Sequence, residues 1–130
     1  MRDKNQQRFY DFENKMLKIY LPSELNDGLS LEDARSLVTR ICKDYKVTIP
    51  EVKQGTSNKI AYYKTLDHKI VLPPWAQRWV VLHEVAHALT RYSEPSHGKE
   101  FIQTWCELWA RMYSLNKEEL MNEARKAHLI

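Results

Sequence analysis

The sequence predicts an α+β domain in which five helices flank a small three-stranded sheet. Three observations lead to this class. Four of the five helical segments carry apolar residues at helical spacing or a capping signal, the residues between them form short β-like runs, and 130 residues suit one domain. We expect a single domain over residues 1–130, with an N-terminal helical extension at about 3–21, a core at about 30–113 and a C-terminal helix at about 117–128.

The first two segments are predicted helices. Residues 5 to about 20 carry apolar side chains at helical spacing, and Pro22 ends this pattern. A turn-rich connection at residues 23–28 follows. Ser30 with Asp33 then forms a pattern similar to a capping box, and a continuous apolar stripe in the next residues predicts the second helix.

The middle of the chain predicts the sheet. Residues 47–52 form a β-like run, which Pro50 makes a weak or edge strand because proline cannot donate a backbone hydrogen bond. Residues 60–66 and 69–72 are expected to be two strands joined by a turn at residues 67–68. This hairpin leads into the most distinctive segment of the sequence.

The last two segments are again predicted helices. One runs from about residue 97 to 113, with Ser96 as its expected N-cap. The other runs from about residue 117 to 128, with Asn116 and Glu119 as its capping pair.

Composition excludes several classes of protein. The formal charge of +3 arises from 20 basic and 17 acidic residues that are intermixed, so there is no strong nucleic-acid signal. No apolar run approaches about 18 residues and the first ten residues are polar, so we expect neither a membrane span nor a signal peptide. Cys42 and Cys106 cannot form a disulfide framework; they are expected to be buried free thiols in a cytoplasmic protein.

The segment HEVAH, residues 83–87, predicts a metal site. It lies in an apolar run that is expected to be a buried helix from about residue 75 to 91. Residues four apart share a helix face, so His83 and His87 would direct two imidazoles at one zinc ion. Glu84 is displaced around the helix, where it can reach a water molecule on the metal without being a ligand.

A catalytic zinc site needs a third protein ligand. His97 is our first candidate, because a short loop after His87 can return it to the metal and Gly98 has no side chain to crowd that approach. Glu107, on the same following helix, is the rival ligand. We expect it to be a solvent-facing or outer carboxylate instead.

The two motifs, HEVAH and then HGKEF at residues 97–101, resemble the zinc core of the SprT-like metallopeptidases. This resemblance covers about residues 59–109. The whole chain is more closely similar to short metallohydrolases of actinobacteria and their phages, which share an apolar run-in at residues 78–82. They also share a polar start, here Arg2, Asp3, Gln7, Arg8, Tyr10 and Glu13.

The resemblance implies a minimal zincin-like fold, in which the sheet packs on the HExxH helix, and a location in a bacterial or phage-infected cell. It implies Zn2+ as cofactor, with His83, His87 and His97 as ligands. The cysteines needed for the zinc ribbon of SprT-like proteins that act on DNA-crosslinked proteins are lacking, so that substrate is not carried over. The resemblance also places residues 60–64 as an edge strand that could bind an extended peptide.

The expected reaction is hydrolysis of a peptide bond in a protein or peptide substrate. Zinc would lower the pKa of a water molecule, and Glu84 would act as general base. Two alternatives stay open: an inert, zinc-stabilised binding module, and a hydrolase of a non-peptide amide. Candidates for stabilising the oxyanion are Tyr62, Tyr63, His68, Tyr92 and Tyr113, and candidates for orienting the histidines are Asp67, Glu94 and Glu100.

Overall fold

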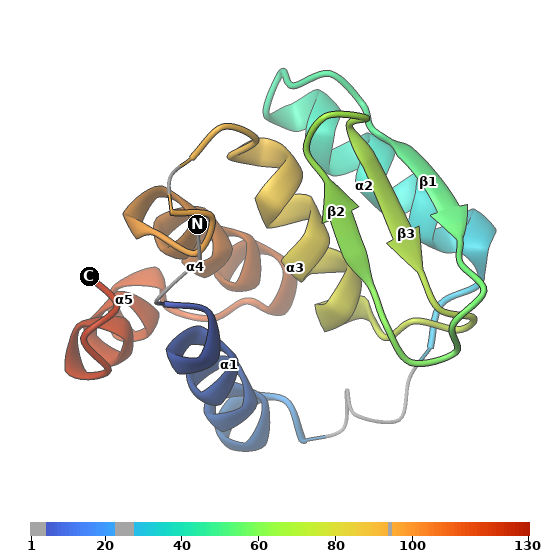
Figure 1. Cartoon of the computed structure of the whole chain (residues 1–130). Helices are drawn as coiled ribbons and strands as arrows, with labels where there is room; N and C mark the ends of the chain where they lie inside the picture. Colours follow the sequence, from blue (N-terminus) through green and yellow to red (C-terminus); the bar gives the residue numbers. More distant parts are fainter. Residues whose placement is uncertain (1–4, 23–27, 94) are drawn as a thin grey trace. The chain divides into compact units, whose positions relative to one another are not determined.

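A computed structural model describes residues 5–22, 28–93 and 95–130, and it confirms the α+β class. Five helices and three strands follow one another in the predicted order α, α, β, β, β, α, α, α along the described residues (Figure 1). They belong to two compact units. The sheet unit comprises residues 23–91, and the terminal unit comprises residues 1–22 together with residues 92–130.

The sheet unit contains two helices and all three strands of the described chain. These are α2 (Leu31–Asp44), β1 (Glu51–Gln54), β2 (Tyr62–Lys64), β3 (Lys69–Leu72) and α3 (Arg78–Leu89). The strand order is β1-β3-β2, with β1 parallel and β2 antiparallel to β3 (Figure 1). The sheet is therefore mixed, with β3 in its centre.

The register explains which face of the sheet is buried. Ile70 of β3 lies between Val52 of β1 and Tyr63 of β2, and aligned residues of neighbouring strands point to the same face. Ile70 and Val52 are buried, and β1 and β3 contact α2 and α3 respectively. This row of side chains therefore forms the core between the sheet and its two helices.

Two strands differ from their predicted bounds. β1 begins at Glu51, after Pro50, because proline supplies no N–H for the ladder. β2 is limited to Tyr62–Lys64, whose partners are Val71 to Lys69 of β3. Leu66, predicted to lie in this strand, is 92% exposed and belongs to the turn that connects β2 to β3.

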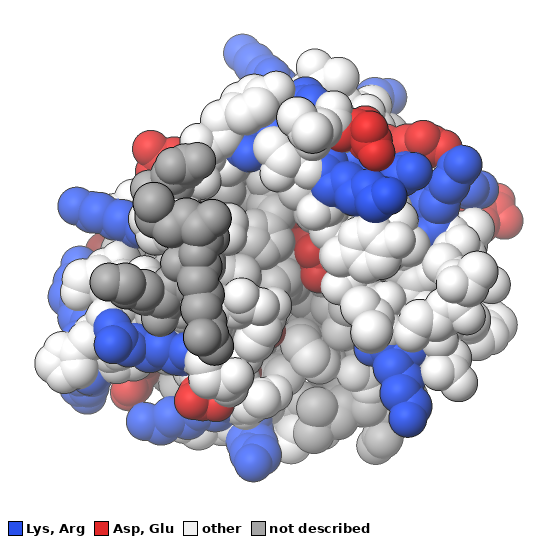
Figure 2. Space-filling view, in the orientation of Figure 1, with Lys and Arg blue, Asp and Glu red and all other residues white. Residues whose placement is uncertain are grey.

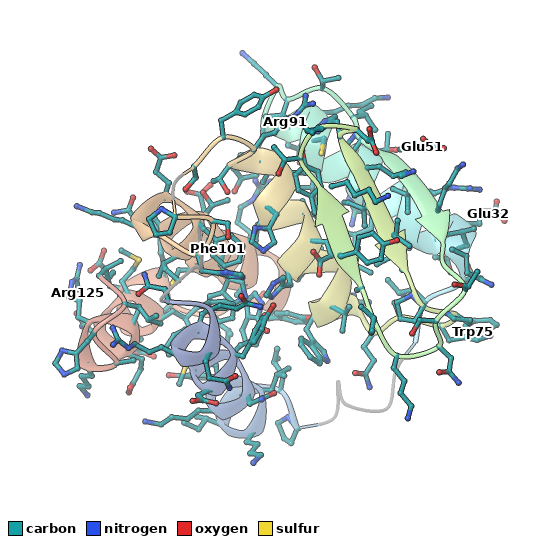
Figure 3. All side chains as sticks on the ribbon, viewed as in Figure 1. Glu32, Glu51, Trp75, Arg91, Phe101 and Arg125 are labelled. Carbon is teal, nitrogen blue, oxygen red and sulfur yellow. The ribbon has the colours of Figure 1, made fainter. Side chains whose placement is uncertain are left out.

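The start of α3 also differs from the prediction. Trp75 was expected to be helical, but its φ of 55° is left-handed, and α3 begins only at Arg78 with Gln77 as its N-cap. The segment instead pairs with the chain before α2: Gly28 forms a β-bridge with Gln77. A Cβ on Gly28 would lie 2.3 Å from the carbonyl oxygen of Trp75, so only glycine permits this approach. The Trp75 side chain is left exposed (Figure 3).

The terminal unit contains three helices that share an aromatic core. They are α1 (Gln6–Tyr20), α4 (Lys99–Tyr113) and α5 (Lys117–Lys126). The buried rings at its centre are Phe9, Phe12, Phe101, Trp105 and Trp109. α1 is held to α4 by a buried hydrogen bond over 3.1 Å, which Trp105 Nε1 donates to Glu13 Oε2.

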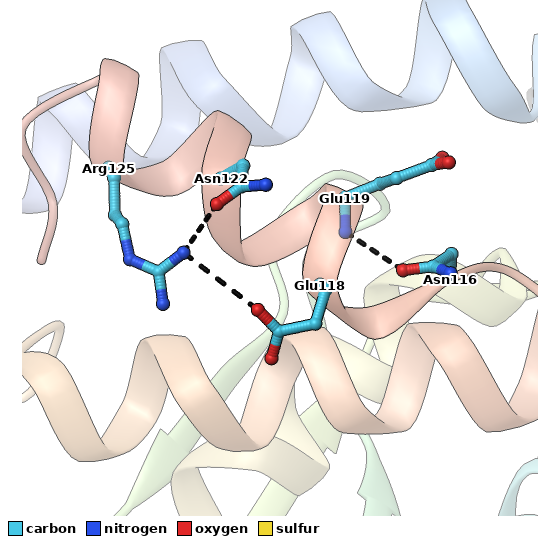
Figure 4. A network of polar contacts seen from close by, with 5 residues as sticks. All are labelled: Asn116, Glu118, Glu119, Asn122 and Arg125. Carbon is cyan, nitrogen blue, oxygen red and sulfur yellow. Dashed lines mark hydrogen bonds and ion pairs between the residues drawn. The ribbon is translucent and has the colours of Figure 1, made fainter.

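Two of the three predicted helix caps are confirmed. Ser30 Oγ accepts a hydrogen bond from the backbone N–H of Asp33 over 3.0 Å at the start of α2. Asn116 Oδ1 accepts from the N–H of Glu119, also over 3.0 Å, at the start of α5 (Figure 4). Near the end of α5, Arg125 contacts Asn122 and Glu118, which places a cation at the negative end of the helix dipole (Figure 4).

The third predicted cap, Ser96, is wrong. The N-cap of α4 is Gly98, which has no side chain that could bond to the first turn. The reason is a tight turn before the helix, in which the N–H of Gly98 donates to the carbonyl oxygen of Pro95 over 2.9 Å. This turn moves the first helical residue to Lys99.

Charge is mixed on the surface. In the face shown in Figure 2, Lys and Arg side chains alternate with Asp and Glu side chains and with uncharged residues. This distribution agrees with the small formal charge of +3. Among the described helices, none combines the length and the apolar character that crossing a membrane requires.

Candidate metal centre

The sheet unit places the two histidines of HEVAH in the middle of α3. Their ring centroids are 5.0 Å apart with an interplanar angle of 62°, so the i, i+4 spacing brings both imidazoles to one face. His83 is 5% exposed and His87 is half-buried. The pair therefore forms a donor set that is fixed by a regular helix and is largely shielded from water.

α3 is buried on nearly all sides, as its apolar sequence predicts. Val81, Leu82, Val85 and Ala86 are fully buried around the two histidines, and α3 contacts α2, β2 and β3. This packing fixes the helix that carries the donors. The local sequence therefore determines both the direction of the imidazoles and the rigidity of their support.

Glu84 follows His83 on α3 and is only 6% exposed. Burial of a carboxylate is costly unless it is hydrogen-bonded or paired with a positive charge. Successive helical residues are about 100° apart around the axis, so Glu84 points beside the helix face that carries His83 and His87 and not along that face. A buried carboxylate beside two imidazoles is the arrangement that the HExxH pattern predicts.

The chemistry of these donors fits a zinc ion. Imidazole nitrogens suit zinc and its neighbours in the first transition row, whereas calcium and magnesium prefer sets of oxygen ligands. His83 and His87 could each supply one imidazole nitrogen from the same helix face. Two such nitrogens would fill half of a tetrahedral coordination shell.

His97 lies in the terminal unit and is only 4% exposed. Its imidazole is stacked on the ring of Phe9, with centroids 5.6 Å apart and an interplanar angle of 25°. Tyr10 and Phe101 contact it edge-on, at 5.5 Å and 4.9 Å. The residue is therefore a packed, oriented histidine and not a mobile loop side chain.

Gly98 lies where a side chain would not fit, for a reason that is local to the turn. A Cβ at this position would lie 2.8 Å from the carbonyl oxygen of Pro95. A side chain would therefore open the turn that brings His97 to the start of α4.

Glu107, the rival ligand, is engaged elsewhere within the terminal unit. Its Oε2 lies 3.5 Å from Nζ of Lys117, and its side chain is 41% exposed. An exposed pair of this kind contributes little to stability. It does, however, direct the Glu107 carboxylate toward the first turn of α5.

Two oxyanion candidates bond to each other within the sheet unit. The Nδ1 atom of His68 lies 2.7 Å from Tyr63 Oη, and its Nε2 atom lies 2.6 Å from the carbonyl oxygen of Thr48. A carbonyl can only accept, so Nε2 carries the hydrogen and Nδ1 accepts from the Tyr63 hydroxyl. Both side chains thereby fix the hairpin turn to the segment before β1.

The other candidates are dispersed. Tyr62 is 41% and Tyr92 74% exposed, while Tyr113 packs against Trp109 in α4. Of the proposed orienting carboxylates, Asp67 and Glu100 are exposed. Glu94, like Arg2 and Asp3 of the polar start, lies outside the described residues.

Three residues around His97 were not singled out by sequence reasoning as part of the site. They are Asn5, Phe9 and Tyr10, which all precede His97 by more than 80 positions. Phe9 was recognisable only as part of an apolar helix face. The polar start contained Tyr10, but nothing in the sequence connected it to His97.

The cysteines are confirmed as buried free thiols. Burial raises the pKa of the Cys42 thiol to about 11. It raises that of Cys106 to about 12, although Lys117 and Arg125 oppose the shift. Both therefore remain protonated at neutral pH.

No protein-family model, no curated protein and no solved structure matches this chain.

Proposed function

We propose that the protein is a zinc-dependent peptidase in which His83, His87 and His97 bind the metal ion and Glu84 is the general base. One observation carries this proposal: a 6% exposed glutamate follows directly on a buried histidine whose helical partner is 5.0 Å away, centroid to centroid. His97 follows His87 by ten residues in the sequence and would supply the third imidazole. Three imidazoles would leave the fourth position of a tetrahedral site for water or substrate.

When bound, zinc polarises a substrate carbonyl and brings the pKa of a water molecule toward neutrality. Glu84 supplies what the metal does not. Its carboxylate takes a proton from the attacking water and delivers that proton to the leaving amine. The apolar residues of α3 exclude competing water and strengthen the interaction between this carboxylate and the charges that develop beside it.

The same donors would serve an inert, zinc-stabilised binding module, or a hydrolase that cleaves a non-peptide amide. Burial of Glu84 favours an enzyme over the inert module, because a structural site closed by protein ligands has no use for a buried base. The choice between amide substrates depends on residues outside α3.

The test is Glu84→Gln in the purified full chain. Glutamine keeps the shape and a hydrogen-bonding group but cannot accept the proton. We expect stoichiometric zinc and an unchanged melting temperature, with hydrolysis of an unfolded protein substrate reduced about 100-fold or more. Glu32→Gln, at an exposed position of α2 in the same unit, is the matched control and should retain full turnover.

Equal turnover of the Glu84→Gln variant and the parent, with zinc bound to both, would contradict the proposed mechanism. A parent that binds zinc but cleaves neither unfolded proteins nor small amides would support the binding module instead.

A further inference from the structure

α1 has a buried face that does more than complete the core of the terminal unit. Phe9, which is fully buried, lies with its ring against the imidazole of His97. Just before α1 begins, Asn5 Nδ2 donates a hydrogen bond over 3.0 Å to the carbonyl oxygen of the same histidine. One helix thus contacts both the side chain and the backbone of His97.

The three rings around His97 restrict its orientation from different sides. Phe9 covers a face of the imidazole at an interplanar angle of 25°, while Tyr10 and Phe101 meet it at 73° and 77°. Rotation about χ1 or χ2 would drive the imidazole into one of these rings. The hydrogen bond from Asn5 fixes the backbone from which the side chain extends.

α1 is itself anchored at points away from His97. Glu13 accepts the buried hydrogen bond from Trp105, and Arg8 Nη1 donates to the carbonyl oxygen of His128 over 3.0 Å. α1 is therefore held in place by contacts other than those with His97, and His97 packs against it.

We propose that α1 is a positioning element of the metal centre, and that Phe9 and Asn5 hold His97 in the orientation in which it binds the ion. This inference rests on the proposed function, since it takes His97 to be a ligand. A ligand that is already ordered binds without losing rotamer freedom at that moment. Loss of either contact should therefore weaken metal binding, on the scale of about 10- to 100-fold that is typical for partners of metal-bound histidines.

Phe12 provides a matched control for Phe9. It lies on the same helix, is 4% exposed, and packs against Phe9 and Trp105. Its described ring contacts do not include His97. Phe9→Leu and Phe12→Leu should therefore lose similar amounts of core packing, while only the first loses the flat ring beside the imidazole.

Asn5→Asp provides a second variant that spares the fold. Asn5 is the N-cap of α1 but its side chain makes no capping hydrogen bond, and aspartate is at least as favourable at a helix N-terminus. The substitution removes the N–H donor that reaches His97 O and places a negative charge beside that oxygen. We expect α1 to remain folded while the hydrogen bond from residue 5 to the carbonyl oxygen of His97 is lost.

The experiment measures metal affinity by competition with a chromophoric chelator, using Zn2+ and, for its absorption bands, Co2+. We expect Phe9→Leu and Asn5→Asp to weaken binding about 10-fold or more and to change the intensity of the Co2+ bands, which report the ligand geometry. Phe12→Leu should change affinity less than about 3-fold. Phe9→Trp, which restores a flat ring, should recover most of the parent's affinity.

A metal-free measurement separates this inference from the proposed function. In the apo protein, amide hydrogen exchange at residues 97 and 98 should be faster in Phe9→Leu than in Phe12→Leu. If both leucine variants lose affinity and protection equally, α1 is only structural and the inference is overturned. If His97→Ala leaves the affinity of the parent unchanged, His97 is no ligand, and the proposed site fails with it.

Discussion

Arg91 Nε donates a hydrogen bond over 2.9 Å to the carbonyl oxygen of Thr65, in the turn between β2 and β3. Its Nη2 atom donates to the next carbonyl, that of Leu66, over 3.2 Å. Arg91 follows the end of α3 and lies four residues after His87. The helix that carries the histidine pair is thereby joined to the turn that ends strand β2.

We expect Arg91→Met to loosen this turn. The substitution keeps a long side chain but removes both hydrogen bonds, and the free energy of unfolding should fall by about 1 kcal/mol. Amide exchange at residues 65–68 should become faster, as measured by exchange with mass or NMR detection. Arg91→Lys restores one donor, so its exchange rate should lie between those of the parent and of Arg91→Met. An unchanged exchange rate in Arg91→Met would show that the contact does not constrain the turn.

The two edges of the sheet are expected to bind peptides differently. At β1, Arg35 Nε donates over 3.0 Å to the carbonyl oxygen of Val52, so a helix side chain already occupies this edge. β2 is the other edge strand, and we predict that an extended, substrate-like peptide pairs with it. N-methylation of the peptide amides that face β2 should weaken binding about 10-fold for each strong hydrogen bond removed.

The control for this prediction is methylation of the alternate amides, which point away from the strand. An equal loss of affinity for both sets of methylated peptides would exclude strand addition. A bound peptide-like inhibitor that makes no backbone contacts to β2 would exclude it as well.

Metal affinity should distinguish the two candidates for the third ligand. His97→Ala should lower zinc affinity by more than 100-fold, because it removes a direct metal bond, whereas removal of an outer partner costs about 10- to 100-fold. Glu107→Gln weakens a half-exposed contact with Lys117, and zinc affinity should stay within about 3-fold of the parent. Zinc retained by the first variant and lost by the second would make Glu107 the ligand.

The buried thiols predict both reactivity and a pH dependence. Thiols with a pKa of about 11 and about 12 are protonated at pH 8, so a thiol reagent should label neither Cys42 nor Cys106 until the chain unfolds. The folded pKa values lie above the unfolded value of 9.0. The stability contributed by the neutral thiols is therefore complete below pH 9 and is lost as pH rises toward 11 to 12.

Denaturation midpoints of the parent and of Cys42→Ala, measured from pH 8 to 10.5, test whether stability falls as pH rises. The variant is less stable throughout, because a buried side chain is shortened, but its midpoint should fall less steeply with pH. Rapid labelling of the folded protein at pH 8 would contradict the prediction for the thiols.

Local signals in the sequence predicted the elements whose causes are local. Ser30 and Asn116 cap their helices because their side-chain oxygens reach an N–H three residues away. The i, i+4 spacing of His83 and His87 likewise determined their ring pair without reference to the rest of the chain. Where a pattern and its partner lie within one turn of helix, sequence alone was sufficient.

The errors arose where distant residues determine the conformation. Trp75 was predicted to be helical, but the segment pairs with Gly28, which no periodicity reveals. Ser96 has the right residue type for a cap, yet the turn from Pro95 to Gly98 moves the start of the helix past it. The packing of Phe9 on His97 joins residues 88 positions apart, and the apolar stripe of α1 gave no indication of its partner.

The terminal unit is formed by two stretches of chain that flank the sheet unit, and this order has a consequence for synthesis. α1 leaves the ribosome before its partners His97 and Trp105, which follow only after residues 23–91 have been translated. Until then the aromatic side of α1 lacks the rings of α4 that cover it in the folded unit. Folding of the sheet unit brings the flanking segments closer along the chain and lowers the entropic cost of their meeting. The nascent chain therefore presents the His83–His87 pair before the packed environment of His97 exists.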